Sequence, residues 1–452
     1  MRPTDIRVVD CKFETESFAY RSPIKFGGVA LDKATLLNTE VTVETSAGKR
    51  STGRGSMPMG NVWAFPTKSL TYEQTLGSML EVAKGVAGIY TQSKILGHPI
   101  EITWQLEHAM LEEGGRVSKA MELADTVPSL AVLVAASPFD AALHDAFGKL
   151  HGLNSYHTYA DPFLDDDIGR FLGDSFKGVR IRDHVLTEPV AQMPLYHLVG
   201  ALDPLTTSEV TKPVGDGLPE TLGEWILFNG LTHLKIKLNG DDLEWDVNRV
   251  LGVENATKEA QAKRGITEWK YSLDFNEKCR NVRYLLDFIE ELRGRSPSAF
   301  SRISYIEQPT ARDLSASRAN VMHDASRQIP VVIDESLVDL ESLFLAREMG
   351  YTGVALKACK GQSQSVLFAS AARHLGMFLC VQDLTCPGAS LIQSASLAAH
   401  VKGVQAIESN GRQYCPAANK AWEADFPGLF LMKDGMAVTA NLNGQGLGAY
   451  KS

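Results

Sequence analysis

The sequence lacks the features that usually indicate cysteine-bound metals, disulfide frameworks or export. Its six cysteines include no Cys-x-x-Cys pair, which argues against the common zinc-binding and disulfide frameworks. No apolar leader follows the first residues, MRPTDIRVVD. We therefore expect a reduced, cytoplasmic protein.

Long hydrophobic runs and an excess of positive charge are also missing. The most apolar window, residues 128–139 (PSLAVLVAASPF), is too short and too interrupted to span a bilayer. The formal net charge of −9 argues against nucleic acid or an anionic membrane surface as the main partner. The expected partner is a small molecule, with no nucleic acid and no membrane.

The composition that is present is that of an ordinary globular protein. Of 452 residues, 44% are hydrophobic and 22% are charged, which allows a large core and more than one domain. Residues 35–50 (TLLNTEVTVETSAGKR) alternate apolar and polar side chains. This alternation predicts a strand of a half-exposed antiparallel sheet.

Three helical patterns follow this strand. They cover residues 71–90, 100–115 and 137–152. Thr71 and Ser137 are the expected N-caps, and Gly152 is the expected helix stop. Residues 1–153 are therefore predicted to form an α+β domain.

From about residue 191 the pattern changes to short β-rich runs that alternate with helical patterns. The runs are residues 193–202, 231–238, 268–275, 302–309, 329–336, 351–358, 376–383 and 403–410. This alternation predicts an α/β fold, a modified TIM (β/α)8 barrel over residues 191–415. Residues 154–190 have no sustained period and are assigned to an insertion or linker. Residues 416–452 are expected to form a hairpin and a glycine-rich end that folds back toward the first domain.

Charged side chains stand at the ends of the predicted strands, where barrel active sites are built. They are Lys235 and Lys237 on the second run, Asp274 on the third, Glu307 on the fourth, Asp334 and Glu335 on the fifth, and Lys357 on the sixth. Because side chains alternate along a strand, Lys235 and Lys237 project from the same face. One rim therefore carries three strands that end in carboxylates, between strands that end in lysine.

Three carboxylates that converge on one rim repel one another unless a cation holds them. Hard oxygen ligands suit Mg²⁺, or Mn²⁺. Such an ion stabilises an enediolate when a base removes the proton next to a carboxylate. We expect Lys237 to transfer that proton, and Lys235 to disfavour the ammonium form of Lys237 and to bind a substrate oxygen.

The motifs KIKL, LDFN, YIEQP, VVIDES and VALKACKG together resemble the barrel motifs of the enolase superfamily, in particular its muconate-lactonizing-enzyme branch in the mandelate racemase/muconate lactonizing enzyme family. The chemistry of a lysine base with Mg²⁺ is known for this superfamily. The resemblance implies that Lys237 and Lys357 face each other across the substrate, and that Asp274, Glu307 and Asp334 hold the metal.

The same resemblance implies that residues 1–153 are a capping domain. Substrate choice would then lie in two of its segments, around residues 25–33 and 53–65, and the protein would be a homo-oligomer. Departures from the family pattern, KGQSQS after the sixth strand and the insertions at 154–190 and about 202–217, leave the substrate open.

Several assignments remain open at this point. Lys360 competes with Lys357 for the role on the sixth strand, and we prefer Lys357. Asn276 either contacts the water shell of the metal or forms a turn. Glu335 either contacts Lys237 or a metal ligand, or caps the following helix. Asp383 and Glu408 either orient the substrate or a lysine, or cap the following helices. His197 and His233 are expected to be packed histidines rather than bases.

The reaction is narrowed but not determined by these residues. Two opposed lysines favour racemisation or epimerisation, or a cycloisomerase, and the same first step serves β-elimination, as in an o-succinylbenzoate synthase or an acid-sugar dehydratase. Strand eight lacks the Asp-x-Asp of dipeptide epimerases, and strand seven lacks the histidine of mandelate racemases. The alternative of another class is a non-catalytic protein that binds metal or carboxylate.

Overall fold

The computed structural model describes residues 2–26, 29–164 and 166–450, and in them the eight predicted strands close into a barrel. The strands are β4 (Gln192–Val199), β5 (His233–Lys237), β6 (Lys270–Asp274), β7 (Ile303–Glu307), β8 (Val331–Ile333), β9 (Gly353–Leu356), β10 (Phe378–Val381) and β11 (Ile407–Glu408). Each is parallel to the next, and β11 returns to β4 through the pair Ile407 and Leu195. The predicted (β/α)8 architecture is confirmed.

The lower interior of the barrel is filled by one layer of side chains. This separate cluster consists of Tyr196, Tyr305, Val332, Ala355, Cys380 and Ala406. Because side chains alternate along a strand, the residue two positions later on each strand also faces inward. Those later positions lie at the carboxyl ends of the strands, above this layer, which we call the interior plug.

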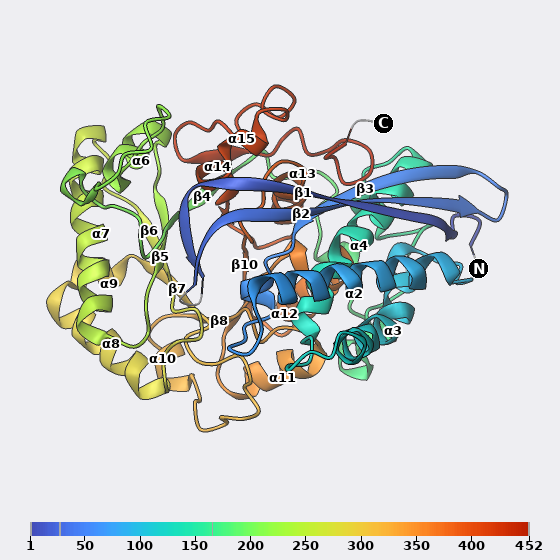
Figure 1. Cartoon of the computed structure of the whole chain (residues 1–452), viewed down its shortest axis with the longest axis horizontal. Coiled ribbons are helices and arrows are strands. Elements are labelled where there is room, and N and C mark those ends of the chain that lie inside the picture. The colour runs from blue at the N-terminus through green and yellow to red at the C-terminus, as the bar shows by residue number, and fades with distance from the viewer. Residues whose placement is uncertain (1, 27–28, 165, 451–452) are drawn as a thin grey trace.

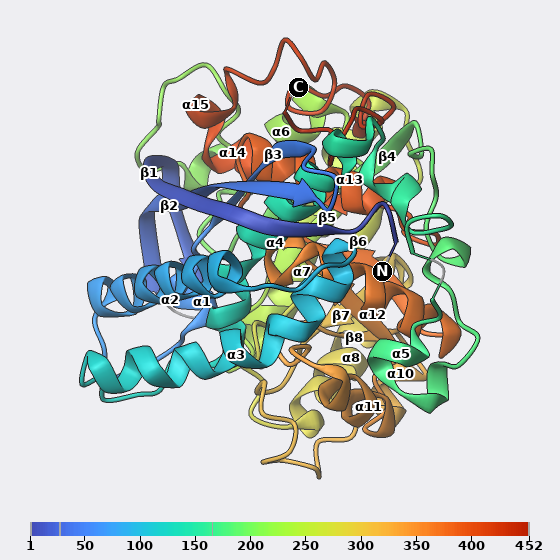
Figure 2. The same cartoon turned by 90° about the vertical axis from the view of Figure 1, so that its right-hand side faces the viewer.

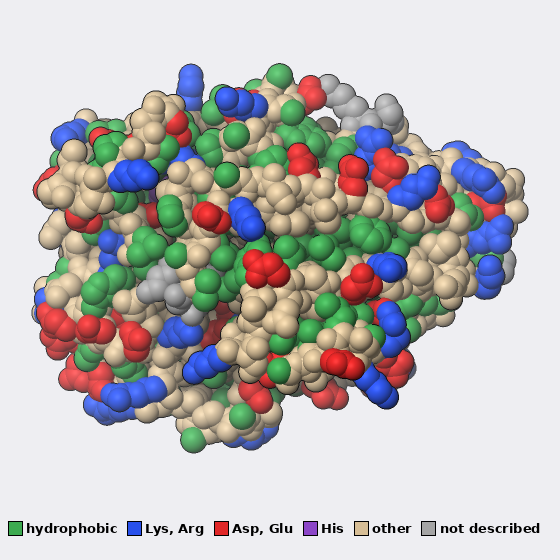
Figure 3. Space-filling model, viewed as in Figure 1, with side chains coloured by type: hydrophobic (Ala, Val, Ile, Leu, Met, Phe, Trp, Pro, Cys, Tyr) green, Lys and Arg blue, Asp and Glu red, His purple; other side chains and the backbone are tan. Residues whose placement is uncertain are grey.

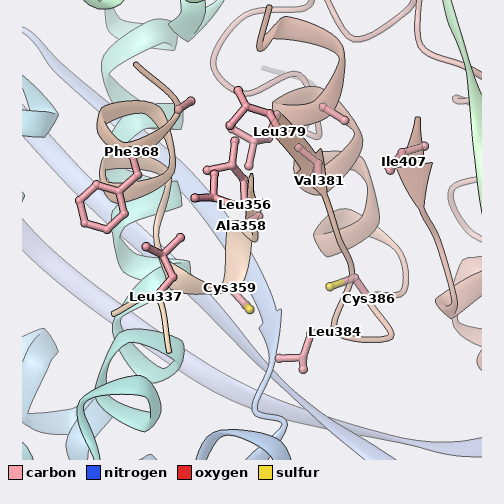
Figure 4. Packing of buried hydrophobic residues seen from close by; sticks show 14 of the residues in the cluster. Leu337, Leu356, Ala358, Cys359, Phe368, Leu379, Val381, Leu384, Cys386 and Ile407 are labelled. Carbon is pink, nitrogen blue, oxygen red and sulfur yellow. The ribbon is translucent and has the colours of Figure 1, made fainter. Parts of the chain in front are cut away.

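Helices cover the outside of the barrel. They are α6 (Leu222–Asn229), α7 (Leu243–Arg264), α8 (Val282–Arg295), α9 (Pro297–Ser301), α10 (His323–Ser326), α11 (Leu340–Glu348), α12 (Gln362–His374) and α13 (Ala389–His400), followed by the short α14 (Gly411–Tyr414) and α15 (Pro416–Asn419). Figure 4 shows the outward side chains of Leu356, Leu379 and Val381 among these helices, with Phe368 of α12 nearby. Their burial explains why the outward positions of these strands are apolar.

An antiparallel sheet and four helices precede the barrel. The strands are β1 (Ile6–Phe26), β2 (Val29–Thr45) and β3 (Arg50–Pro58), and the helices are α1 (Asn61–Ala64), α2 (Tyr72–Gln92), α3 (Pro99–Ala120) and α4 (Ser129–His151). Figure 1 shows α2 and α3 below the sheet on the right, whereas β1 and β2 reach across toward the barrel, and Figure 2 shows the same elements from the right-hand side. Figure 3 shows acidic and basic side chains interspersed over this face.

Two of the expected helix ends are confirmed and one is wrong. Thr71 caps α2 by accepting from the backbone N–H of Gln74, and Gly152 ends α4 in the left-handed conformation. Ser137 is not an N-cap, because α4 already begins at Ser129 and continues through Pro138. The hydroxyl of Ser137 donates to the carbonyl of Val134 at 2.9 Å, which is the acceptor that Pro138 cannot use.

Helix α4 is the one helix in the described ranges that is long and apolar enough to cross a membrane. Of its most apolar window, 94% is buried inside the protein, and the core helix of a soluble protein passes the same test. All six cysteines lie in the described ranges and none is paired.

Helix α4 packs directly on the backbone of β3. A Cβ atom at Gly55 would lie 2.0 Å from the carbonyl oxygen of Pro138. We expect Gly55→Ala to lower the free energy of unfolding by about 1–3 kcal/mol, since helix and sheet would have to separate. Urea denaturation measures this change.

Gly77→Ala is the matched control for that substitution. A Cβ at Gly77, in the middle of α2, meets nothing within 4 Å. Alanine there should raise stability by about 0.5–1 kcal/mol. Equal effects of the two substitutions would contradict the close approach of α4 to β3.

Residues 154–190 hold only short helical turns, of which the longest are η1 (Ser155–Thr158) and α5 (Gly169–Leu172) in the described part. In the tail, the expected hairpin is limited to one bridge between Lys433 and Met436, and β12 (Met436–Val438) pairs with β4 instead. The glycine-rich end contacts α4, where Leu447 N donates to Asp145 at 3.0 Å. The boundaries of domains at 153, 190 and 415 stay a prediction.

A small cavity of about 90 Å³ separates α3 and α4 from α12, and Glu107 lines it. Burial, together with the charges of Asp339 and Asp140, raises the pKa of Glu107 from 4.5 to about 7. Between these pH values the folded protein holds a proton that the unfolded chain releases. The free energy of unfolding should therefore fall as pH rises from about 4.5 to 7, by up to about 1.4 kcal/mol per pH unit.

Glu107→Gln should remove this contribution to the pH dependence. Urea denaturation at pH 5 and pH 8 tests it, and the variant should lose less stability between the two than the parent protein. Glu112→Gln, an exposed position on the same helix, serves as control. An unchanged pH slope in Glu107→Gln would contradict the buried state of this carboxyl.

Candidate functional site

The charged strand ends named above all meet at the carboxyl end of the barrel. Glu307, Asp334 and Lys357 each follow a residue of the interior plug by two positions, and so does Glu408 on β11. In the closed ring, β5 and β9 are separated by three strands on one side and three on the other. Lysine from β5 and lysine from β9 therefore stand on opposite sides of the barrel, and the carboxylates of β6, β7 and β8 occupy the arc between them.

Lys235 lies at the centre of the acidic groups. Its Nζ is 2.8 and 3.0 Å from the two carboxylate oxygens of Glu307, 2.9 Å from Glu408 and 3.1 Å from Asp274. Burial alone would lower the pKa of Lys235, but these carboxylates raise it well above its ordinary value. Lys235 is thus a fixed positive charge, and its role as a binder of substrate oxygen stays a prediction.

Lys237 extends further toward the rim than Lys235. Its Nζ donates to Asp274 and, at 3.0 Å, to Asn276 Oδ1. The register of β5 and β6 places Lys237 beside Asp274. The predicted base and a predicted metal ligand are therefore direct neighbours.

Both lysines that compete for the sixth-strand role contact Asp334. The Nζ of Lys357 is 2.7 Å from Asp334 Oδ2, and that of Lys360 is 3.2 Å from Oδ1 and also donates to the backbone carbonyl. Lys357 has the inward position of β9, whereas Lys360 lies in η5 (Ala358–Lys360) and also borders the cavity beside Glu107. This placement supports Lys357 as the residue that faces the barrel mouth.

The crowded carboxylates have strongly shifted pKa values. Burial and the charge of Asp274 raise the pKa of Glu307 well above its usual range. Burial would also raise the pKa of Asp334, but the ammonium groups of Lys357 and Lys360 lower it to about 2. Such opposite shifts in neighbouring groups are typical of sites that bind ions or transfer protons.

A residue of the N-terminal part completes the site. It lies in the segment around residues 53–65 that was expected to select the substrate, although the sequence did not single it out. Trp63 of α1 donates from Nε1 to Glu335 Oε1 at 2.8 Å, and its ring lies 4.4 Å from the Nζ of Lys357. Burial and the charge of Asp334 raise the pKa of Glu335 to about 7. Glu335 is therefore tied to the cap as well as to the barrel.

The two candidates on the last strands have different surroundings. Glu408 faces inward and contacts Lys235. The carboxylate of Asp383 accepts from the backbone N–H groups of Leu384, Cys386 and Asn410, which joins the loops after β10 and β11. The inward residue after β10 is Gln382, which donates to Glu307. It was not named from the sequence, although the alternation from Cys380 indicates it.

The two candidate histidines are packed, as expected. His197 accepts from Arg412 at 2.6 Å, and burial lowers its pKa well below the usual value. His233 lies against the ring of Tyr196 with ring centroids 5.0 Å apart. Neither ring contacts the carboxylates of the rim in the described structure.

The backbone at the rim is in uncommon conformations. Asn276, Glu277 and Gln308 follow β6 and β7 with φ of 45°, 64° and 29°. Each such non-glycine residue costs about 1–3 kcal/mol, and they tend to occur at functional sites. At Asn276 this conformation aims the amide at Lys237.

Asp274, Glu307 and Asp334 fit a hard divalent cation in charge and donor type. All three are at most 1% exposed, and they stand on adjacent strands. Within the described ranges, no three His, Cys, Asp or Glu side chains are grouped so that they could hold one ion as they stand. The ammonium groups of Lys235 and Lys357 contact the carboxylates instead. Mg²⁺ or Mn²⁺ would compete with these two lysines for the same oxygens.

Comparison with known proteins identifies one matching family and many solved structures with a similar fold. The family model described as enolase C-terminal domain-like matches residues 220–450. No significant match was found among curated proteins.

Three of the similar solved structures illustrate the likeness. A dipeptide epimerase from Enterococcus faecalis, solved with Mg and L-Leu-L-Tyr, has a TM-score of 0.61 at 16% identity and covers 98% of this chain and 99% of its own. A muconate lactonizing enzyme from Pseudomonas fluorescens, solved with muconolactone, has 0.61 at 16%, covering 99% and 97%. An N-succinyl Arg/Lys racemase from Bacillus cereus has 0.62 at 14%, covering 99% and 96%. At these identities the likeness is one of fold.

Proposed function

Because the chain belongs to the mandelate racemase/muconate lactonizing enzyme family of the enolase superfamily, we propose that it is a Mg²⁺-dependent enzyme that removes the proton alpha to a carboxylate. Asp274, Glu307 and Asp334 would hold the ion. When bound, Mg²⁺ supplies the positive charge that stabilises the enediolate of the substrate. Mn²⁺ can take the same ligands.

The observation that carries this proposal is the placement of two buried lysines on opposite strands of the ring. Lys237 and Lys357 are 8% and 5% exposed, and the three carboxylates stand between their strands. A base on each face of a planar enediolate can remove the proton on one side and return it on the other. We therefore favour a racemase or epimerase, and a cycloisomerase uses the same first step.

The remaining polar groups have supporting roles in this proposal. Lys235 contacts Asp274, Glu307 and Glu408, and in this proposal it would also bind a substrate oxygen. The ring of Trp63, which is itself hydrogen-bonded to Glu335, contacts Lys357 from the side of the cap. Burial of these groups strengthens every charge interaction in the site, because water is excluded.

The test is alpha-proton exchange in D₂O. The purified protein with Mg²⁺ is incubated with a set of carboxylic acids that includes N-acyl amino acids, dipeptides and sugar acids, and deuterium uptake is followed by mass spectrometry. Uptake that requires Mg²⁺ supports the proposal. A loss of water from the substrate instead of uptake would indicate β-elimination.

A non-catalytic protein that binds carboxylate would give a different pattern. It would be stabilised by one of the acids with Mg²⁺ in a thermal-shift experiment and would show no exchange with that acid. Because binding alone needs no proton acceptor, Lys237→Met and Lys357→Met would then leave binding largely unchanged.

A further inference from the structure

A cavity of about 430 Å³ lies between α1, the start of α2 and the barrel rim. Trp63 and Asn276 form part of its wall, and these two residues contact Lys357 and Lys237 respectively. A substrate held between the two lysines would therefore border this cavity with its distal end. Its volume lies in the range of small-molecule sites.

One wall of the cavity is apolar and comes from the N-terminal part. Phe65, Leu70 and Tyr72 line it together with Trp63. Val29 contributes from the other segment that was expected to select the substrate, whereas Gly27 and Gly28 of that segment lie outside the described residues. This wall suits an aliphatic or aromatic spacer.

The wall on the side of the barrel carries a guanidinium with an unused donor. Arg312 donates to Glu277 Oε2 from Nε at 2.8 Å and to the backbone carbonyl of Trp63 from Nη2 at 3.0 Å. Its Nη1 is buried and has no hydrogen-bond acceptor in the described structure. The charge of Glu277 is satisfied by Arg312, so neither group needs a further counterion, and the buried Nη1 brings its unpaired N–H close behind this wall.

Two more positive charges stand at the cavity. Lys68 and Lys278 both line it and are exposed, and the ammonium group of neither forms an ion pair or hydrogen bond in the described part of the chain. The one further acid in the lining is Glu335, which is held by Trp63 at the inner end. The outer part of the cavity is therefore positive, with an aromatic wall behind it.

We propose that this cavity binds a second acidic group of the substrate, so that the substrate is a dicarboxylate whose two acids are joined by an apolar or aromatic segment. This inference rests on the proposed function for the position of the first carboxylate. The exposed ammonium groups of Lys68 and Lys278 would receive the distal carboxylate, and the guanidinium of Arg312 would add positive charge from the wall behind them. The spacer would lie along Phe65, Leu70 and Tyr72.

Matched pairs of acids test this inference. Each pair has the same reacting end and differs only in a distal carboxylate or its primary amide: N-succinyl against N-succinamoyl amino acids, and 4-carboxymandelate against 4-carbamoylmandelate. We expect kcat/KM for exchange, and the affinity of the protein with Mg²⁺ by calorimetry, to favour the carboxylate member of a pair by at least 10-fold. Raising the salt concentration should shrink this ratio.

Charge reversal locates the effect. Lys68→Glu and Lys278→Glu, together, should lower the ratio at least 10-fold, mainly through KM. Lys94→Glu, an exposed lysine in the loop after α2, makes a charge change away from the cavity and should keep the ratio. Arg312→Gln should lower the ratio as well, and circular dichroism confirms that each variant is folded.

The outcomes separate the inference from the proposed function. Exchange or binding that is equal for both members of every pair, or a ratio that the double charge reversal leaves unchanged, would overturn the inference while leaving the proposed function intact. Preferred binding of the carboxylate member without exchange of any acid would support the inference and overturn the proposed function.

Discussion

Alanine in place of Lys357 is expected to lower alpha-proton exchange of one substrate enantiomer by about 10²–10⁴-fold, the usual contribution of a positioned acid or base. Exchange of the other enantiomer should continue, because Lys237 serves the opposite face. Lys237→Ala should give the mirror-image result. The reason is geometric, since β5 and β9 lie across the ring from each other.

Enantiomerically pure acids make this measurement decisive. Each enantiomer is incubated with each variant in D₂O and Mg²⁺, and deuterium uptake is compared with racemisation measured by chiral chromatography. Lys360→Ala is the matched control, because Lys360 also contacts Asp334 but lies in η5, the short helix after β9. Equal loss for both enantiomers in Lys357→Ala would contradict a two-base mechanism and would favour one base with electrostatic help.

The barrel could be predicted because its signals are local. Each strand from β5 to β11 is a short, mainly apolar run that ends in a polar residue or is followed by one, and alternation alone decides which side chains share a face. Strand number and order then place Lys235, Asp274, Glu307 and Asp334 on one rim without any long-range information. The register of β5 with β6 agrees with this placement.

The start of α4 could not be read correctly from local signals. Ser137 and Pro138 resemble an N-cap followed by a proline at the first helical position. In the fold, the apolar residues before them are buried between the sheet and the barrel, and the hydroxyl of Ser137 satisfies the carbonyl that Pro138 leaves free. Tertiary packing thus overrides a valid local signal.

The contribution of Trp63 could not be predicted for a different reason. It reaches Glu335 across 272 residues of sequence, and nothing in its neighbourhood marks a tryptophan that contacts a lysine of the barrel. The inward residue after β10 was within reach, because alternation from Cys380 selects Gln382, which was not named. Contacts between distant parts of the chain can be predicted only once the fold is known, whereas the inward or outward direction of a side chain follows from alternation within its own strand.

The electrostatics of the rim link the proposed lysine and metal chemistry. The ammonium groups of Lys235 and Lys357 contact carboxylates that are also the proposed ligands of Mg²⁺. A divalent ion on these oxygens would weaken the hold of Asp334 on Lys357 and of Asp274 on Lys237, and so favour their neutral forms. The ion would then help to prepare the bases as well as stabilise the enediolate.

Asn in place of Asp274 is expected to weaken Mg²⁺ binding by more than about 100-fold, because one of three anionic ligands becomes neutral. The same change leaves Lys237 without its carboxylate and removes one of the three that surround Lys235. The metal-free variant should also lose about 3–5 kcal/mol of stability, as when one partner of a buried ion pair is removed.

Calorimetry with Mg²⁺ and urea denaturation of metal-free protein measure the two effects of Asp274→Asn separately. Asp383→Asn is the matched control, since Asp383 is another buried acid of the rim, and its oxygens accept from backbone N–H groups. It should keep Mg²⁺ affinity within a few-fold. Unchanged Mg²⁺ affinity in Asp274→Asn would remove Asp274 from the ligand set. Lys235 and Lys237 would still lose a carboxylate partner, so the loss of stability would remain. That combination would show that Asp274 serves only the two lysines.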